Sequence, residues 1–366
     1  MESRRQDGVF RMGEALRVAQ VGIGAWGFDW AWRIVPSVPE VEAVAYVDFD
    51  PGALARLQER LPQARGRCFD SLARAVEATR PDAVLVTTTL GGHEPLTRAA
   101  LEAGTHVLVE KPFTDSLDSA RDLVELAAAR DRVLMVSQNY RHYPAPRAVA
   151  NLLAGGELGE LYMVSIDFRR NDPSPPKPKR RHHSDVQPLL LDMSIHHFDL
   201  LRYLLGREAT SVLCDAVSPS WSGYDGPPAA FANIDFEGVA VSYRGSWISA
   251  GPSTNWAGEW RMEFEHGHVS WTSRGEQDQP NERVVLRPRR GRPRALPLPD
   301  VSRIDRWGTL TEFAAALREG REPETSGRRN LGTMALVTAA VESARRGERV
   351  EVPPTEPSAD EVAIEA

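Results

Sequence analysis

Residues 22–27 read Gly-Ile-Gly-Ala-Trp-Gly, and they follow directly on an apolar run at residues 16–21. This arrangement predicts a buried strand, a tight turn and a helix that begins at the turn. The first glycine permits the turn, the second lets the backbone approach a pyrophosphate, and the third lets helix and strand pack closely. The helix N-terminus supplies amide donors to the phosphates. The predicted dinucleotide contacts in this loop are Gly22, Ile23, Gly24, Ala25, Trp26 and Gly27.

An acidic residue at the right distance supports this prediction. Asp48 ends a second apolar run at 41–47, about 20 residues after Gly27, which is the spacing of the acid that binds the ribose hydroxyls. Together with Asp50 it would repel a 2′-phosphate, so we expect NAD as the cofactor and regard NADP as less favoured. Arg56 and Arg60 on the next predicted helix could soften this preference.

The remaining patterns predict an α/β protein with two domains. Apolar runs at 82–86, 106–109 and 133–136 alternate with helical segments such as 51–61 and 94–103, as in a doubly wound parallel sheet of the Rossmann type. Beyond residue 145, segments with alternating polarity predict a large, mostly antiparallel open sheet in a C-terminal α/β domain, closed by helices at 304–317 and 331–345. The predicted organisation is a flexible arm at 1–15, an NAD-binding domain at 16–145, a substrate-binding and oligomerisation domain at 146–352, and a disordered tail at 353–366.

Composition excludes several functions. The chain has 366 residues, with 44 lysines and arginines against 51 acids, and a net charge of −7 argues against nucleic-acid binding. The N-terminal residues lack the apolar core of a signal peptide or membrane anchor, so no membrane partner is expected. Only two cysteines are present, without metal-ligand spacing, which fits a reducing cytoplasm. Lysine is rare, because Lys111, Lys177 and Lys179 are the only three.

Two further motifs carry candidate chemistry. Glu110-Lys111-Pro112 follows the strand at 106–109, at the carboxyl edge of the predicted sheet, where ligands of doubly wound folds bind. Residues 191–199 read LDMSIHHFD and predict a helix that carries Asp192 and His196 on one face, at i and i+4. Such a pair can orient an imidazole for proton transfer near neutral pH.

At these residues the chain resembles the Gfo/Idh/MocA family (glucose-fructose oxidoreductase, inositol dehydrogenase, MocA), over roughly 16–352. The resemblance is carried by GIGAWG, ALEAGTHVLVEKP, VSQNYRHYP and DMSIHHFD. It implies an NAD-dependent dehydrogenase that oxidises a secondary hydroxyl of a sugar or polyol by hydride transfer to nicotinamide, without a metal. Lys111 would stabilise the alkoxide, His196 would carry the proton, and Asp192 would hold the histidine or the substrate.

The resemblance also implies further site residues and a homodimer or homotetramer. Further cofactor contacts are expected at Thr88, His93, Glu110, Lys111 and Asn139, and substrate contacts at Arg141, Tyr143, Arg170 and His197. The chain departs from the family pattern at two places. The family commonly has Thr-Pro-Asn-His where this chain reads Thr88-Thr89-Leu90-Gly91. The family also commonly has a glycine inside the second motif, where this chain has Ser194. These departures leave the loop contacts and the pocket shape open.

Other interpretations stay open at this point. His197 serves equally well as a packing residue, and the basic segment 169–183 either covers an anionic substrate or is a solvated or subunit-contacting loop. An NAD-dependent glycosidase that oxidises a sugar transiently is one alternative function. A non-catalytic sugar or nucleotide sensor on the same fold is another.

Overall fold

A computed structural model describes residues 14–172, 187–276 and 281–355. The chain divides into two compact units, Met1–Asn139 with Arg303–Leu331, and Tyr140–Ser302 with Gly332–Ala366. We refer to them as the first and the second unit. None of the described helices is both long enough and apolar enough to span a bilayer.

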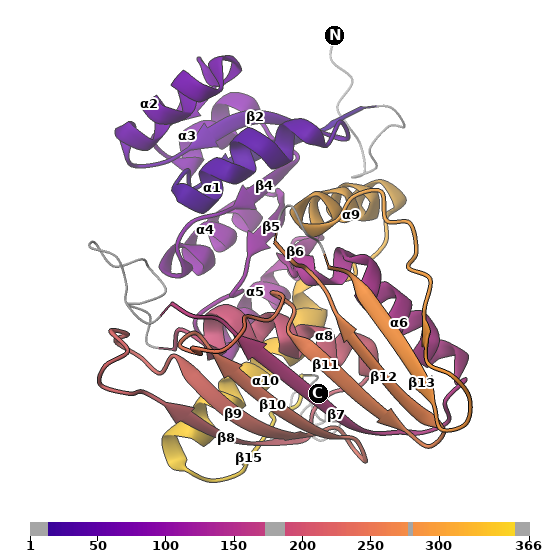
Figure 1. Ribbon diagram of the computed structural model, residues 1–366. Helices are drawn as coiled ribbons and strands as arrows, with labels where there is room; N and C mark the ends of the chain where they lie inside the picture. Colours follow the sequence, from indigo (N-terminus) through magenta and orange to yellow (C-terminus); the bar gives the residue numbers. More distant parts are fainter. Residues whose placement is uncertain (1–13, 173–186, 277–280, 356–366) are drawn as a thin grey trace, which may run out of the picture. The chain divides into compact units, whose positions relative to one another are not determined.

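The first unit contains a six-stranded parallel sheet in the order β3-β2-β1-β4-β5-β6 (Figure 1). This order is that of the doubly wound dinucleotide-binding fold, whose ligand site lies where the strand order reverses between β1 and β4. The strands are nearly continuous apolar runs because both faces of the sheet are buried. Their bounds are β1 Leu16–Val21, β2 Val41–Val47, β3 Cys68–Phe69, β4 Ala83–Val86, β5 His106–Glu110 and β6 Leu134–Ser137.

Three helices of the first unit, α2, α3 and α5, begin at residues whose side chains cap them. The Asp50 carboxylate accepts a hydrogen bond from the Gly52 amide at the start of α2, and Pro51 takes the first helical position. Ser71 and Ser116 cap α3 and α5 in the same way. The helical segments are α1 Ala25–Asp29, the π-helical turn η1 Trp30–Ile34, η2 Val35–Ser37, α2 Pro51–Arg60, η3 Pro62–Ala64, α3 Leu72–Thr79, α4 Leu90–Glu102, α5 Leu117–Ala129 and α9 Asp305–Glu319.

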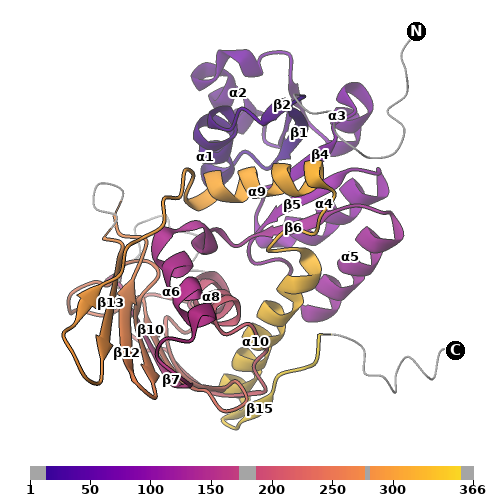
Figure 2. The same ribbon diagram turned by 90° about the vertical axis from the view of Figure 1, so that its right-hand side faces the viewer.

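Helix α9 belongs to the first unit, although the sequence pattern places it in the second domain. Its residues Leu310, Phe313 and Leu317 join the same buried cluster as Leu16 of β1 and Trp30 of η1. Figure 2 shows α9 running alongside the parallel strands. The difference arises because an apolar helical stripe predicts burial but does not specify which sheet buries it.

The second unit contains a nine-stranded sheet in the order β14-β13-β12-β11-β7-β10-β9-β8-β15. The neighbours are antiparallel except β7 and β10, which run parallel. The predicted fold class is confirmed by these two sheets. The strand bounds are β7 Leu161–Arg169, β8 Ser211–Val217, β9 Ala229–Asp235, β10 Ala240–Ser246, β11 Glu259–Phe264, β12 Gly267–Thr272, β13 Arg283–Pro288, β14 Arg294–Ala295 and β15 Val350–Glu351.

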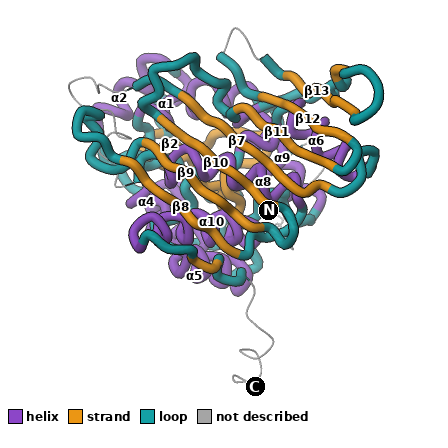
Figure 3. The backbone as a smooth tube through the Cα atoms, turned by 60° about the horizontal axis from the view of Figure 1, so that its bottom comes forward, coloured by secondary structure: helices purple, strands orange, loops and turns teal. Residues whose placement is uncertain are grey.

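One face of this sheet is covered by helices and the other is open. Burial alternates along β9 and β10, so that Val241 and Tyr243 face the helices while Phe231 and Arg244 lie on the open face. Figure 2 shows α6, α8 and α10 on one side of the strands, and Figure 3 shows the strands in front of these helices. The helical segments are η4 Asn139–His142, α6 Pro144–Gly155, the π-helical turn η5 Leu190–Ser194, α8 Ile195–Leu205 and α10 Gly327–Arg346.

Candidate active site

The three glycines of residues 22–27 have distinct surroundings in the first unit. Gly22 has a φ of +93°, and a Cβ there would lie 2.6 Å from Cγ2 of Thr88. A Cβ on Gly27 would lie 1.9 Å from the carbonyl oxygen of Gly22, so only glycine allows this helix to approach its strand. A Cβ on Gly24 would meet no atom of the described residues within 4 Å. The loop therefore has open space at the glycine where a pyrophosphate would approach the backbone.

Asp48 lies beside this loop at the end of β2. Its carboxylate accepts hydrogen bonds from the amide of Ile23 at 2.6 Å and from the amide of Asp50 at 2.9 Å. Two backbone donors hold the acid against the turn at the carboxyl edge of the sheet. This is where an acid that receives ribose hydroxyls is needed, so the residues present fit a dinucleotide.

Glu110 connects the glycine-rich loop to the end of β5. The residue is 4% exposed, and its Oε1 accepts the indole N–H groups of Trp26 at 2.9 Å and Trp30 at 2.7 Å. Ser137 of β6 donates to the same oxygen at 3.3 Å, and the amide of Lys111 donates to Oε2 at 3.2 Å. The buried carboxylate therefore holds three segments in place through its own hydrogen bonds.

Lys111 follows β5 directly, and its side chain is half-buried. The peptide bond between Lys111 and Pro112 is cis. The imidazole of His93 lies between two backbone oxygens, with Nδ1 2.6 Å from the carbonyl of Pro112 and Nε2 3.2 Å from that of Thr88. His93 therefore joins the loop after β4 to the loop that carries the lysine, and Thr88 itself stays half-buried.

Two residues of α9 contact residues of this part of the first unit. The guanidinium of Arg306 lies 4.0 Å from the centre of the Trp26 ring and forms an ion pair with Asp29. Trp26 nonetheless stays 46% exposed. Asn139, an expected cofactor contact, donates its side-chain amide to the carboxylate of Asp305. Arg306 was not among the predicted residues, since α9 carries no local signal that links it to the glycine-rich loop.

The residues of the second predicted motif lie in the second unit, around His196. The segment is helical, but Asp192 falls in the π-helical turn η5 and His196 is the second residue of α8. A π-helical turn has more residues per turn than an α-helix, and the shared face of Asp192 and His196 stays a prediction. Such turns are frequent at functional sites. His196 is 5% exposed, and Asp192 is half-buried.

Tyr140 packs against the imidazole of His196. The two rings are parallel, with centroids 4.0 Å apart and planes within 4°. The guanidinium of Arg274 lies 4.5 Å from the centre of the Tyr140 ring and donates to its hydroxyl, which in turn donates to the sulfur of Met193 at 3.7 Å. Tyr140 and Arg274 were missed by the sequence analysis. Tyr140 lies inside the SQNYRHYP motif, whereas Arg274 is not marked by any local pattern.

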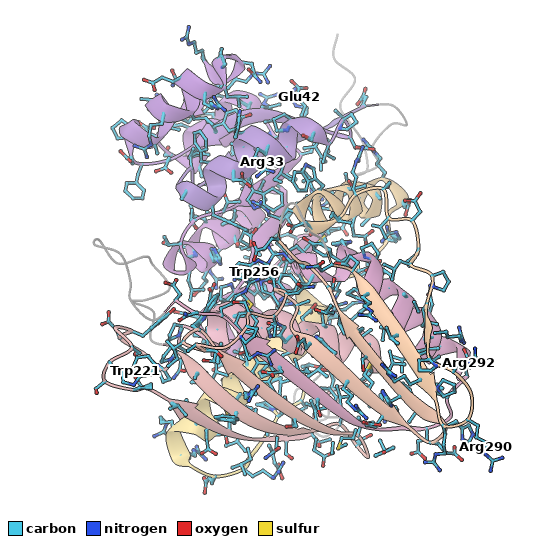
Figure 4. The ribbon with its side chains drawn as sticks, viewed as in Figure 1. Arg33, Glu42, Trp221, Trp256, Arg290 and Arg292 are labelled. Carbon is cyan, nitrogen blue, oxygen red and sulfur yellow. The ribbon has the colours of Figure 1, made fainter. Side chains whose placement is uncertain are left out.

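Arg170, an expected substrate contact, stacks on an indole. Its guanidinium lies 3.9 Å from the centre of the Trp256 ring, and Nη1 forms an ion pair with Glu276 at 2.6 Å. Figure 4 labels Trp256, which lies in the loop that precedes β11. The basic residues from 177 to 183 lie outside the described residues.

Three other expected substrate contacts are buried within the second unit. Arg141 binds Asp199 through two hydrogen bonds of 2.6 and 2.7 Å, so a buried ion pair engages two of its three guanidinium nitrogens. Tyr143 is buried at the start of α6. His197 bonds to the hydroxyl of Tyr243 at 3.2 Å and the carbonyl of Trp256 at 3.1 Å, and complete burial lowers its pKa to about 4. His197 therefore stays neutral at physiological pH.

Two segments of the sequence match models of one protein family. Residues 16–138 match the sequence pattern described as "Oxidoreductase family, NAD-binding Rossmann fold" of GFO_IDH_MocA. Residues 147–270 match the GFO/IDH/MocA C-terminal domain, and the two matches cover more than half of the chain. The chain belongs to the Gfo/Idh/MocA family. It is an NAD-binding oxidoreductase, which confirms the predicted family, enzyme class and cofactor.

Relatives within the Gfo/Idh/MocA family act on polyols and sugars. Inositol 2-dehydrogenase of Corynebacterium glutamicum is 32% identical over 202 residues, covering 55% of this chain and 57% of that enzyme. The chain thus spans little more than half the length of that relative. D-apiose dehydrogenase of Paraburkholderia graminis is 29% identical over 345 residues, covering 91% of this chain and 88% of that enzyme.

A solved structure extends the likeness over nearly the whole chain. It is an inositol dehydrogenase homolog from Azotobacter vinelandii complexed with NADH and myo-inositol. Its sequence is 25% identical to this chain, and the two structures superpose with a TM-score of 0.79. The superposition covers 94% of this chain and 100% of that one. The likeness supports the same two-sheet architecture for both proteins.

Proposed function

We propose that this protein oxidises a secondary hydroxyl of a sugar or polyol and transfers the hydride to NAD. The main support is the position of Lys111 at the carboxyl end of β5. The preceding residue, Glu110, is hydrogen-bonded to Trp26 of the glycine-rich loop. The ammonium group of Lys111 is therefore one residue from a side chain that is bonded to the glycine-rich loop, on the part of the chain that a bound dinucleotide would reach.

Each side chain has a role in this proposal. When bound, NAD accepts the hydride from the carbon that carries the reacting hydroxyl. His196 takes the hydroxyl proton, and the ammonium of Lys111 donates a hydrogen bond to the oxygen as negative charge develops on it. Asp192 holds His196 or the substrate. The products are a ketone, NADH and one proton, so atoms and electrons balance without a metal.

The experiment is a screen for NADH formation over neutral sugars, inositols, uronates and sugar phosphates, with NAD supplied. Formation of NADH in proportion to ketone supports the proposal. Hydrolysis of a glycoside without net NADH would instead identify a glycosidase that oxidises its substrate transiently. Tight NAD binding without turnover of any compound would contradict enzymatic oxidation and favour a sensor.

We also propose that the open face of the nine-stranded sheet pairs with a second copy of the chain, giving a homodimer or homotetramer. Phe231 on this face is 51% exposed, and a large exposed aromatic side chain favours burial against a partner. Light scattering tests this, and Phe231→Arg should lower the measured mass. A wild-type mass equal to the 40.5 kDa of one chain would contradict the proposal. The cytoplasmic location stays a prediction.

A further inference from the structure

Two arginines and two aromatic rings form a connected cluster beside His196 in the second unit. Arg170 lies 3.9 Å from the centre of the Trp256 ring, and Arg274 lies 5.7 Å from the same centre. Arg274 also lies 4.5 Å from the centre of the Tyr140 ring, which is stacked on His196 at 4.0 Å. One aromatic ring therefore separates a guanidinium from the imidazole to which we assign the proton transfer.

Within the part of the chain that the structure describes, the charge of Arg170 is only partly balanced. Its ion-pair partner, Glu276, has a side chain that is 66% exposed, and a solvated carboxylate of this kind holds its partner weakly. The Nε of Arg170 is buried and has no hydrogen-bond partner within the described ranges. An N–H group in that position has a strong need for an acceptor oxygen.

The neighbouring arginine on β7 shows the difference. Arg169 pairs with the carboxylates of Asp167 and Glu259, and its Nε donates to the carbonyl of Pro252. Asp167 also pairs with Arg244, so Arg169 belongs to a shared network of carboxylates and guanidinium groups, as expected for a structural role. Among the residues that the structure describes, Arg170 pairs with one exposed carboxylate, that of Glu276, and not with the carboxylates that bind Arg169, so the two adjacent arginines are in different electrostatic environments.

A second acid near the cluster, Glu282, accepts hydrogen bonds from the backbone. Glu282 accepts hydrogen bonds from the amide of Arg274 at 2.6 Å and from the hydroxyl of Ser273 at 2.8 Å. Burial raises the pKa of this carboxyl above its ordinary value, which favours its neutral form. Glu282 therefore orders the loop that presents Arg274 through its hydrogen bonds.

We infer that Arg170 and Arg274 form a subsite for an anionic group of the substrate, a carboxylate or a phosphate. A planar guanidinium binds either group through paired hydrogen bonds, and stacking on Trp256 and Tyr140 holds both guanidinium groups in orientation. The inference rests on the proposed function and narrows its substrate class to sugar acids or sugar phosphates. The anionic group would lie several bonds from the hydroxyl that is oxidised, since the Tyr140 ring separates Arg274 from His196.

The first experiment compares substrates that differ only in the anionic group. D-Glucose, D-glucuronate and D-glucose 6-phosphate are each supplied with NAD, and kcat/KM is measured from NADH formation, with the same comparison for myo-inositol and an inositol monophosphate. We expect an anionic member to exceed its neutral counterpart by at least about tenfold. A preference for glucuronate would identify a carboxylate, and a preference for the phosphorylated compounds would identify a phosphate. Neutral compounds that react as well as the anionic ones would overturn the inference and leave the proposed function intact.

The second experiment uses variants of the two arginines and a matched control. Arg170→Gln and Arg274→Gln should each lower the ratio of anionic to neutral kcat/KM at least about tenfold, mainly through KM, whereas Arg169→Gln should leave the ratio unchanged. Arg170→Lys and Arg274→Lys keep the charge and should restore part of the ratio if the glutamine variants fold poorly. An unchanged ratio in folded Arg170 and Arg274 variants would overturn the inference.

A binding measurement separates failure of the inference from failure of the proposed function. If no compound yields NADH, calorimetric titration of glucuronate and of glucose 6-phosphate into the NAD-loaded protein still tests the subsite. Binding that Arg170→Gln weakens at least about tenfold would support the anion subsite without oxidation. Equal binding by wild type and variant, or no binding of either anion, would overturn it.

Discussion

The imidazole of His196 lies parallel to the ring of Tyr140, with centroids 4.0 Å apart and planes within 4°. A parallel stack restricts rotation of the imidazole and so fixes where its nitrogens point. We expect Tyr140→Leu to lower kcat about tenfold, because a catalytic group that loses its orientation loses rate. Tyr140→Phe keeps the ring and should keep most of kcat. Equal losses in both variants would show that the hydroxyl matters and the stack does not.

The roles of Lys111 and His196 are tested by removing each side chain. Lys111→Ala and His196→Ala should each lower kcat at least about 100-fold, while the Kd for NAD, measured by fluorescence titration, stays close to that of wild type. His266→Ala is the control, because this histidine is exposed on the second unit. Near-normal turnover of either site variant would refute the assigned role.

Glu110 should matter for both stability and cofactor binding. Glu110→Gln keeps one oxygen as acceptor for Trp26, Trp30 and Ser137, but replaces the other oxygen with an N–H₂ donor that faces the amide of Lys111. Leaving buried donors without acceptors should lower the free energy of unfolding by roughly 1–3 kcal/mol. The Kd for NAD should rise, since Trp26 belongs to the glycine-rich loop. Urea unfolding and NAD titration measure the two effects, and Glu77→Gln, at an exposed position, should change neither.

Cofactor preference should depend on Asp48. We expect kcat/KM to be higher with NAD than with NADP, and Asp48→Ser to lower the NAD value while raising the relative use of NADP, because a 2′-phosphate is no longer repelled. Asp122→Ser is the control, because this acid is exposed on α5 of the same unit and Asp48 and Asp50 both stay in place. A wild-type protein that uses NADP more efficiently would contradict the role given to Asp48.

His197 should make stability depend on pH. Its pKa is lowered from 6.5 to about 4 by burial, so folding favours the neutral imidazole. Its contribution to the free energy of unfolding is complete above pH 6.5, decreases as the pH falls from 6.5 towards 4, and is lost below that. His197→Gln should therefore lose less stability than wild type between about pH 7 and pH 4.

Urea unfolding across this pH range measures the effect of His197→Gln. His106, whose pKa burial also lowers to about 4, is present in both proteins, so its contribution cancels in the comparison. Parallel pH profiles for wild type and variant would show that His197 does not titrate as expected.

Much of the fold follows from local patterns. The strands at 16–21 and 41–47 and the helix beginning at Pro51 lie where their apolar runs and capping residues predict. A parallel strand that is buried on both faces is a continuous apolar run in the sequence. A strand with one exposed face has alternating polar and apolar residues, so both sheets could be expected from the chain alone. The glycine spacing and Asp48 are likewise local signals, and they lie together in the structure.

The remaining features of the site required the tertiary structure. Arg306 meets Trp26 although the two residues are separated by most of the chain, and Arg274 meets Tyr140 across more than a hundred residues. The sequence by itself determined a dinucleotide loop, two sheets and a small set of ionisable candidates, because these depend on periodicity and spacing within short segments. Only the tertiary structure decided that α9 packs in the first unit, that Arg141 is bound to Asp199, and that arginines gather beside His196. Pairing of distant segments depends on the complementary shape and charge of surfaces that form only when the whole chain folds, and no local pattern records it.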